Sequence, residues 1–291
     1  MSGTNIERVL FDVPGPRAVR RIRVASVAAG VLIVAIVTAA VYQFAVHGQL
    51  AASQWDVFGR ASIIEFLAQG LAATLLAAAA AAAIAAPLAL LAAFGRLAKS
   101  RILRTVAGAY VEFLRAVPVL LLLYVFLFVL PHYGLNLPPF WMLVIPLSLS
   151  NSAALAETFR AGILSMERGQ TEAALAIGLS EWQTMRLVIM PQALRRLAPT
   201  LISQGIYLLK GTTLGHVVSY SELLSQAQTI GEYHNIFQHI NGPLVQSYLV
   251  VMAVFVAINA SLAKLARVVE GRQQRRYGRR PARKELVDTV G

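Results

Sequence analysis

The chain has 291 residues, of which 57% are hydrophobic and only 14% are charged, well below the roughly 25% charged residues of a soluble globular domain. This composition excludes a soluble protein and predicts an integral membrane protein. The net charge of +12 is not accompanied by a nucleic-acid-binding motif, so we expect no nucleic-acid partner. The absence of cysteine excludes disulfides and thiol chemistry.

Six apolar stretches have roughly the 20 residues that a helix needs to cross a hydrocarbon core of about 30 Å. In chain order they cover approximately residues 24–46, 63–94, 106–130, 140–160, 194–214 and 244–266. The predicted fold class is therefore an all-α integral membrane protein with about six transmembrane helices.

The first apolar stretch admits two interpretations, a retained transmembrane anchor or a cleaved signal peptide. A basic segment precedes it and Ala51-Ala52-Ser53 follows it, as in a signal peptide. Its apolar run is longer than the roughly 7–15 residues of a signal peptide, which favours the anchor.

Two other stretches have unusual compositions. The second is too long for one crossing, so we expect it to protrude from the membrane or to kink at Pro87. Its alanine run from Ala77 to Ala83 predicts a helix that packs closely inside the protein, with a plain bias towards alanine as the alternative. The fourth is expected to face protein or water rather than lipid, because it contains Pro146, Ser148, Ser150, Asn151 and Ser152.

Lysine and arginine residues follow the topology of the predicted spans. With six spans, 23 of the 26 basic residues fall on one side of the membrane, and Arg60, Arg115 and Lys210 are the exceptions. The positive-inside rule then places both termini and the loop at 165–192 in the cytoplasm. Nine of these residues run from Lys264 onwards, and we interpret this basic tail as a stop-transfer signal in contact with anionic membrane lipid, against a specific partner site.

The loop between the fourth and fifth stretches carries the most informative pattern. Glu172-Ala173-Ala174 is followed by Gly178, and Ser180-Glu181-Trp182-Gln183 has the form of a capping box that starts a helix just after a turn at Gly178. Pro191, which has no N–H group, is expected to separate this short helix from the membrane helix that follows.

This spacing resembles the EAA loop of bacterial ABC importer permeases, with Val188 and Met190 in place of the usual Ile and Leu. From about residue 67 to residue 272, the chain is similar to the polar amino acid permeases of type I ABC importers, in blocks at residues 109–118, 156–162, 191–195 and 208–214. The N-terminal span and the extended loop at 231–242 look like the longer permease of actinobacterial glutamate uptake systems.

The resemblance implies a permease core at residues 63–270, preceded by a basic N-terminus and an additional helix at 1–62 and followed by a basic tail at 271–291. It implies a multi-pass subunit of the bacterial cytoplasmic membrane that imports glutamate or a related polar amino acid by alternating access. The implied partners are a second, similar permease, two cytoplasmic ATPase subunits that dock on the loop at 165–192, and an extracytoplasmic amino-acid-binding protein. The ATPase would bind ATP and magnesium, so this chain is expected to hold no cofactor and to catalyse no covalent step.

The chain has no G-x-x-x-x-G-K-[ST], H-E-x-x-H or G-x-S-x-G motif, so energy must come from another subunit or from an ion gradient. A stand-alone, ion-coupled secondary amino acid transporter is therefore the alternative function. It would need acidic residues at mid-membrane depth to bind the coupling ion, whereas Glu112 and Glu157 are predicted near the cytoplasmic helix ends.

Two carboxylate–guanidinium pairs are predicted at these helix ends, Glu112 with Arg115 and Glu157 with Arg160. The i, i+3 spacing places both charges of a pair on one helix face. We interpret them as ion pairs that make burial tolerable, with a direct role in an inward gate as the alternative.

Substrate-path residues are expected around the fifth stretch. If its helix starts near Leu194 on the inside, a rise of about 1.5 Å per residue puts Lys210 roughly 24 Å up, in the outer half of the bilayer. The resemblance implies a path lined by Asn151, Gln204, Lys210, Thr212 and Thr213. Related permeases commonly carry an acid after this lysine, where the chain has Gly211, and its loss would suit an anionic substrate. The alternative is a lysine that snorkels to the outer interface.

The histidines do not form a metal-binding pattern. His216, His234 and His239 fall in a predicted outside loop without the spacing of a ligand set, so no metal site is expected. Glu222 and Glu232 in the same region are interpreted as exposed loop acids, with contact to a binding protein as the alternative.

Overall fold

The computed structural model describes residues 15–237 and 243–277. The predicted features at residues 1–14, at His239 and in the basic tail after Tyr277, including its contact with lipid, lie outside the described residues. The chain divides into two compact units, Met1–Val57 and Phe58–Gly291, and each is described by itself.

The first unit contains helix α2 (Pro16–Val46) and the short 3-10 turn η1 (Ala52–Gln54). Pro16 lies in the first turn of α2, where its missing N–H costs no helical hydrogen bond. The helix is apolar around its circumference along most of its length, and its described side chains are exposed, as expected for a membrane span. It begins about two turns before the predicted span.

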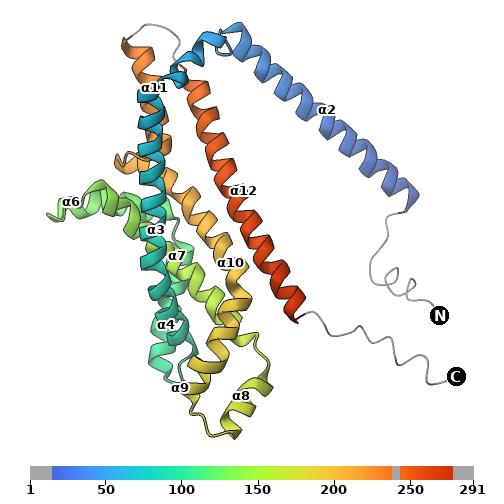
Figure 1. The fold of residues 1–291 in the computed structure, drawn as a ribbon, viewed down its shortest axis with the longest axis vertical. Coiled ribbons are helices and arrows are strands. Elements are labelled where there is room, and N and C mark those ends of the chain that lie inside the picture. Colours follow the sequence, from blue (N-terminus) through green and yellow to red (C-terminus); the bar gives the residue numbers. More distant parts are fainter. Residues whose placement is uncertain (1–14, 238–242, 278–291) are drawn as a thin grey trace. The chain divides into compact units, whose positions relative to one another are not determined.

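The second unit is a bundle of helices, and no strand occurs among the described residues, which confirms the all-α fold class. The 3-10 turn η2 (Asp56–Gly59) crosses the boundary between the units. In Figure 1, α8 and α9 lie near the end of the bundle where α3 ends, and α11 lies beside the beginning of α3. The elements of this unit are α3 (Ala61–Leu97), α4 (Arg101–Ala116), α5 (Val119–Tyr124), the π-helical η3 (Val125–Val129), α6 (Leu130–His132), α7 (Pro139–Leu164), α8 (Arg168–Ala176), α9 (Glu181–Gln183), the π-helical η4 (Thr184–Ile189), α10 (Met190–Gly211), the 3-10 helix η5 (Thr212–Val218), α11 (Leu223–Phe237) and α12 (Leu244–Tyr277).

Four of the described helices are long and apolar enough to cross a membrane, namely α2, α3, α7 and α12. α4 and the helical segment from Val119 to His132 qualify together as a fifth crossing, but they are bent by 94° relative to each other. The span predicted at 106–130 is therefore broken by a sharp bend, which its apolar sequence pattern does not predict. Val117 has an extended backbone, as expected for the residue before a proline, so the helix breaks in front of Pro118.

α10 covers most of the stretch predicted at 194–214, but it is not among these apolar helices. Arg195, Arg196, Gln204 and Lys210 make it too polar for that group. A helix with such side chains needs protein or water along part of its surface.

The packing of α3 on α7 forms the centre of the second unit. One face of α3 carries fully buried alanines at every fourth residue, namely Ala77, Ala81, Ala85, Ala89 and Ala93. These small side chains let the two backbones approach closely, and the same clusters include Leu143 and Ala153 of α7. The predicted packing role of the alanine-rich helix is confirmed. α3 also continues through Pro87 as one helix of 37 residues.

α7 is the most buried of the candidate spans, as its polar residues predict. Ser148, Asn151 and Ser152 are all buried. The hydroxyl groups of Ser148 and Ser152 donate to backbone carbonyl groups about one turn back in the helix, which satisfies them without water.

Replacing Ala85 by leucine should destabilise the protein by about 1–3 kcal/mol, because three extra carbon atoms have no space between α3 and α7. Ala83→Leu is the matched control, since Ala83 lies on the same helix but is exposed. Thermal unfolding of the purified protein in detergent measures both effects. Equal losses of stability in the two variants would show that the alanine face is not a packed interface.

Candidate functional site

The loop at 165–192 turns tightly at Gly178. Gly178 has a φ of 90°, which glycine adopts without a steric penalty, and its N–H donates to the carbonyl of Leu175 at 3.0 Å. Ser180 then caps α9: its Oγ accepts from the N–H of Gln183 at 3.3 Å, and Gln183 Oε1 accepts from the N–H of Ser180 at 2.8 Å. The predicted turn and capping box are both confirmed.

Pro191 does not separate the second loop helix from the membrane helix, so that prediction is wrong. α9 runs through the π-helical η4 directly into α10. Met190 keeps helical backbone angles, and Pro191 lies in the first turn of α10. The wider π turn changes the hydrogen-bond pattern just ahead of Pro191, which accommodates the missing N–H without a break.

Side-chain contacts anchor the loop to the end of α3. The ring centroids of Phe94 and Trp182 lie 6.3 Å apart, and Lys99 Nζ lies 2.6 Å from Glu181 Oε1. The ion pair is exposed and contributes little by itself. Phe94, in contrast, packs on the apolar cluster that contains Ile189. The loop and the end of α3 are therefore linked mainly by apolar packing.

Four large apolar side chains of the loop remain exposed, namely Leu175, Ile177, Trp182 and Leu187. Ile177 is 79% exposed and Trp182 is 63% exposed. Of the predicted coupling residues, Glu172 and Ala173 are exposed as well, whereas Ala174 is buried. Exposed apolar side chains gathered on one short loop are typical of a protein–protein contact.

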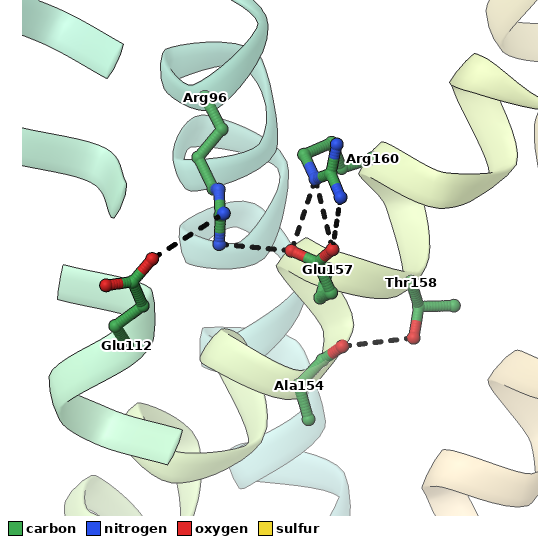
Figure 2. A network of polar contacts seen from close by, with 6 residues as sticks. All are labelled: Arg96, Glu112, Ala154, Glu157, Thr158 and Arg160. Atoms are coloured by element: carbon green, nitrogen blue, oxygen red, sulfur yellow. Dashed lines mark hydrogen bonds and ion pairs between the residues drawn. The ribbon is translucent and has the colours of Figure 1, made fainter. Parts of the chain in front are cut away.

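A network of four charged side chains joins α3, α4 and α7, as Figure 2 shows. Arg96 of α3 contacts Glu157 of α7, with Nη1 and Oε2 3.1 Å apart. It also reaches Glu112 of α4, with Nη2 and Oε1 3.9 Å apart. Arg160 donates from Nε to both carboxylate oxygens of Glu157, at 3.1 and 3.2 Å. Two guanidinium groups therefore share the carboxylate of Glu157.

The predicted pair Glu157–Arg160 is confirmed, but the predicted pair Glu112–Arg115 is wrong. Glu112 pairs instead with Arg96 from another helix, and among the described residues no carboxylate forms an ion pair with Arg115. The i, i+3 spacing brings two side chains to one helix face, but here a guanidinium from α3 supplies the interhelical partner. Arg115 still adds positive charge to the surroundings of Glu157.

A hollow of about 460 Å³ opens beside Arg115. Its walls come from the break between α4 and α5, from α7 and from α10. The polar part of its lining consists of Arg115, Ser150, Gln204 and Tyr207. A guanidinium, an amide and two hydroxyl groups can together bind the charged groups of a small polar molecule. Gln204, one of the predicted path residues, belongs to this lining.

The other predicted path residues lie in different surroundings. Lys210 is exposed and follows Tyr207 by three residues, so the two share a face of α10. Thr212 is buried and Thr213 is half-buried, and their hydroxyl groups donate to carbonyl groups of the last turn of α10 at 2.7 and 2.8 Å. Asn151 is 1% exposed and is not part of the lining, and neither its amide oxygen nor its amide nitrogen has a hydrogen-bond partner among the described residues.

Glu222 is buried, so the prediction of an exposed loop acid is wrong for this residue. It directly precedes α11 and accepts hydrogen bonds from the backbone N–H groups of Leu224 and Ser225. Burial raises the pKa of the Glu222 carboxyl above its ordinary value, although these two N–H groups act in the opposite direction. Glu232 is exposed, as predicted, but it lies on helix α11 and not in a loop.

No cluster of three or more His, Cys, Asp or Glu side chains that could hold a metal ion occurs in the part of the chain that the structure describes. His216 is exposed and bonds through Nδ1 to the carbonyl oxygen of Thr213. The side chain of His234 lies outside the described residues.

Phe94, Arg96 and Tyr207 belong to the site although no sequence motif marks them. Arg96 follows a long apolar run, and a single arginine at that place is a signal for a buried partner on another helix. Tyr207 is three residues after Gln204, so helical spacing alone puts it beside a predicted path residue. Phe94 has no comparable signal.

The family described as "Binding-protein-dependent transport system inner membrane component" matches residues 85–275 of the chain. This range contains the loop at 165–192, all four residues of the charge network and the complete lining of the hollow.

Individual relatives agree with that match. The chain is 36% identical over 211 residues to the probable glutamine ABC transporter permease protein GlnP of Bacillus subtilis (strain 168), covering 72% of this chain and 94% of the relative. It is 32% identical over 250 residues to the glutamate transport system permease protein GluD of Corynebacterium glutamicum, covering 84% and 87% of the two chains. It also resembles a crystal structure of an amino acid ABC transporter with histidines, with a TM-score of 0.64 and 29% identity over 72% of this chain and 94% of that one.

The contact between Arg96 and Glu157 should stabilise the protein, and the exposed contact between Lys99 and Glu181 should not. A double-mutant cycle with Arg96→Met and Glu157→Gln should give a coupling free energy of about 1–3 kcal/mol, because each single change leaves a partly buried charge with fewer partners. The same cycle with Lys99→Met and Glu181→Gln should give less than about 1 kcal/mol. Unfolding of the purified variants measures both values, and coupling of equal size in the two cycles would contradict a role of Arg96 in joining α3 to α7.

Proposed function

This chain belongs to the inner membrane components of binding-protein-dependent transport systems and is the permease subunit of an amino acid ABC transporter; we propose that it imports glutamate or a closely related acidic amino acid. We further propose that partner ATPase subunits drive this import through the loop at 165–192. The chain would then move substrate by alternating access.

The substrate proposal rests on the unbalanced positive charge of the hollow. Arg115 lines the hollow without an ion-pair partner among the described residues, and Lys210 lies further along the same side of α10 as Tyr207. Gly211 supplies no acid beside Lys210. Two unit charges about 4 Å apart interact by on the order of 4 kcal/mol at an effective dielectric of 20. A fraction of that energy selects glutamate over a neutral amino acid severalfold.

The named relatives support a substrate of the size of glutamate or glutamine. They do not distinguish the acid from the amide, so we base that choice on the charge of the site. GluD is named as a glutamate permease and GlnP as a probable glutamine permease. Glutamate carries two carboxylates and one ammonium group, so it matches a hollow with one cation better than glutamine does. The volume of about 460 Å³ also falls in the roughly 300–1,000 Å³ range of small-molecule sites.

Coupling to ATP would use the exposed apolar side chains of the loop. Leu175, Ile177, Trp182 and Leu187 offer an apolar surface that a cleft of an ATPase can cover. The Phe94–Trp182 contact would then pass the movement of the loop to α3. In the assembled importer, two ATPase subunits would bind ATP and magnesium, a second similar permease would complete the membrane part, and an extracytoplasmic binding protein would deliver the substrate.

This assembly gives the bundle an orientation. The end that carries α8 and α9 would face the cytoplasm, together with both chain termini, and the end that carries α11 would face the outside. The excess of lysine and arginine on the side of the loop supports this orientation.

Gly178→Ala should uncouple ATP hydrolysis from import, because a φ of 90° strains any residue with a Cβ atom. Gly169→Ala is a closely matched control: both glycines lie in this loop, both have open space where a Cβ would be added, and only Gly178 has a positive φ. We expect Gly178→Ala to reduce import severalfold at an unchanged amount of protein in the membrane, with Gly169→Ala near wild type. Import and ATP hydrolysis are measured with the reconstituted complex. Wild-type coupling in Gly178→Ala would exclude the loop as the transmitting element.

Arg115→Met should weaken glutamate binding about tenfold, equivalent to about 1.4 kcal/mol, and should affect glutamine less. Arg104→Met is the control, because Arg104 is an exposed arginine on the same helix that does not line the hollow. Gly211→Asp should reduce the preference for glutamate, since it adds a negative charge beside Lys210. Binding of labelled amino acids to the purified complex, without the binding protein, isolates the contribution of the permease. Unchanged glutamate affinity in Arg115→Met would show that the hollow does not hold the substrate.

A further inference from the structure

Glu222 is a buried acid whose two carboxylate oxygens are both occupied by backbone donors. The N–H of Leu224 donates to Oε2 and the N–H of Ser225 donates to Oε1, each at 2.8 Å. These groups belong to the first turn of α11, where backbone N–H groups lack helical partners. Glu222 therefore caps α11, but it does so without any exposed surface.

The beginning of α11 is also held against α3. Thr74 of α3 accepts a hydrogen bond from the N–H of Leu223 at 3.1 Å and donates to the carbonyl of Gly70 at 3.0 Å. A Cβ atom on Gly70 would come within 3.0 Å of the Cα of Leu223. The two backbones thus approach so closely that only glycine fits at this crossing.

The side chain of Glu222 fills the space between this crossing and η5. A Cβ atom on Gly215 would lie 3.0 Å from Cγ of Glu222. The Tyr220 N–H donates to the Gly215 carbonyl at 2.9 Å, and Ser219 between them has a left-handed backbone with a φ of 57°. η5 follows directly on Lys210 and Gly211. The contact with η5 therefore places Glu222 at the outer end of the proposed path.

No cation forms an ion pair with Glu222 among the described residues. The titratable neighbours are His216 of η5, which acts on Glu222, and Tyr220 of the preceding turn, whose own pKa Glu222 helps to raise. A carboxylate buried in this way favours the neutral form, and its pKa is accordingly raised. By linkage, a proton on Glu222 stabilises the arrangement in which this residue is buried. Ionisation of Glu222 favours any arrangement in which the carboxylate is exposed to water.

We propose that Glu222 is a positioning residue that holds α11 and η5 on α3 at the outer end of the path, and that its ionisation lets this end open. The inference rests on the proposed function and orientation. Import should therefore be slow at acidic external pH, where Glu222 is protonated and stays buried, and should rise as the external pH rises through the pKa of Glu222. Below that pKa, the rate should fall by up to about tenfold per pH unit.

Import by the reconstituted complex, measured against external pH at constant internal pH, tests this proposal. Glu222→Gln, which is neutral at every pH, should be slow throughout and nearly independent of pH. Glu222→Asp should keep the acid inhibition, because its carboxylate can still accept from the first turn of α11. Glu232→Gln, which changes an exposed acid on α11, should have the wild-type profile, and His216→Gln should keep the acid inhibition.

Thr74→Val provides a second test that does not depend on the folding of Glu222→Gln. The Thr74 hydroxyl holds the start of α11 on α3 by accepting from the N–H of Leu223, so its removal should weaken the closed arrangement and move the acid inhibition to lower pH. A wild-type pH profile in Glu222→Gln, or in Thr74→Val if Glu222→Gln does not assemble, would overturn the proposal. Absence of ATP-dependent import by the wild-type complex would instead overturn the proposed function.

Discussion

The close approach of α3 and α7 is the constraint on which the rest of the second unit depends. Alanines at every fourth residue of α3 mean that this helix places no bulky side chain on the face that packs on α7. Lipid tails are as apolar as these alanines, so this association is held by van der Waals packing rather than by the hydrophobic effect. Such packing is sensitive to a single added methyl group, and it fixes where both ends of α3 lie.

Each end of α3 uses that fixed position to hold another part of the chain. Near its beginning, Gly70 and Thr74 contact the first turn of α11. Near its end, Phe94 packs on Trp182 of the loop, and Arg96 forms an ion pair with Glu157. α3 therefore contacts both α11, which we place at the outer end of the path, and the loop at 165–192, which we propose as the contact site of the ATPase. With the proposed function, this arrangement would give a physical route between ATP binding and the opening of the path.

Local patterns predict the local features of this molecule well. Ser180 and Gln183 indicate a capping box and Gly178 a turn, because these depend on neighbouring residues, and the structure contains both. Two of the errors concern tertiary contacts. Arg96 of α3 takes the place of Arg115 as the partner of Glu112 on α4, and Glu222 is buried by α3 and η5. Pro191 is accommodated by a π turn that no sequence motif marks.

The central claim is that ATP hydrolysis in partner subunits, and not an ion gradient, drives amino acid movement through this chain. The most direct measurement is glutamate uptake into proteoliposomes that contain the complete complex, with the binding protein outside and ATP trapped inside. Sodium and proton gradients are collapsed with ionophores. The account predicts that uptake continues under these conditions and stops when the trapped ATP is replaced by a non-hydrolysable analogue. Uptake that disappears with the ion gradients and does not need ATP would contradict it and would identify a secondary transporter.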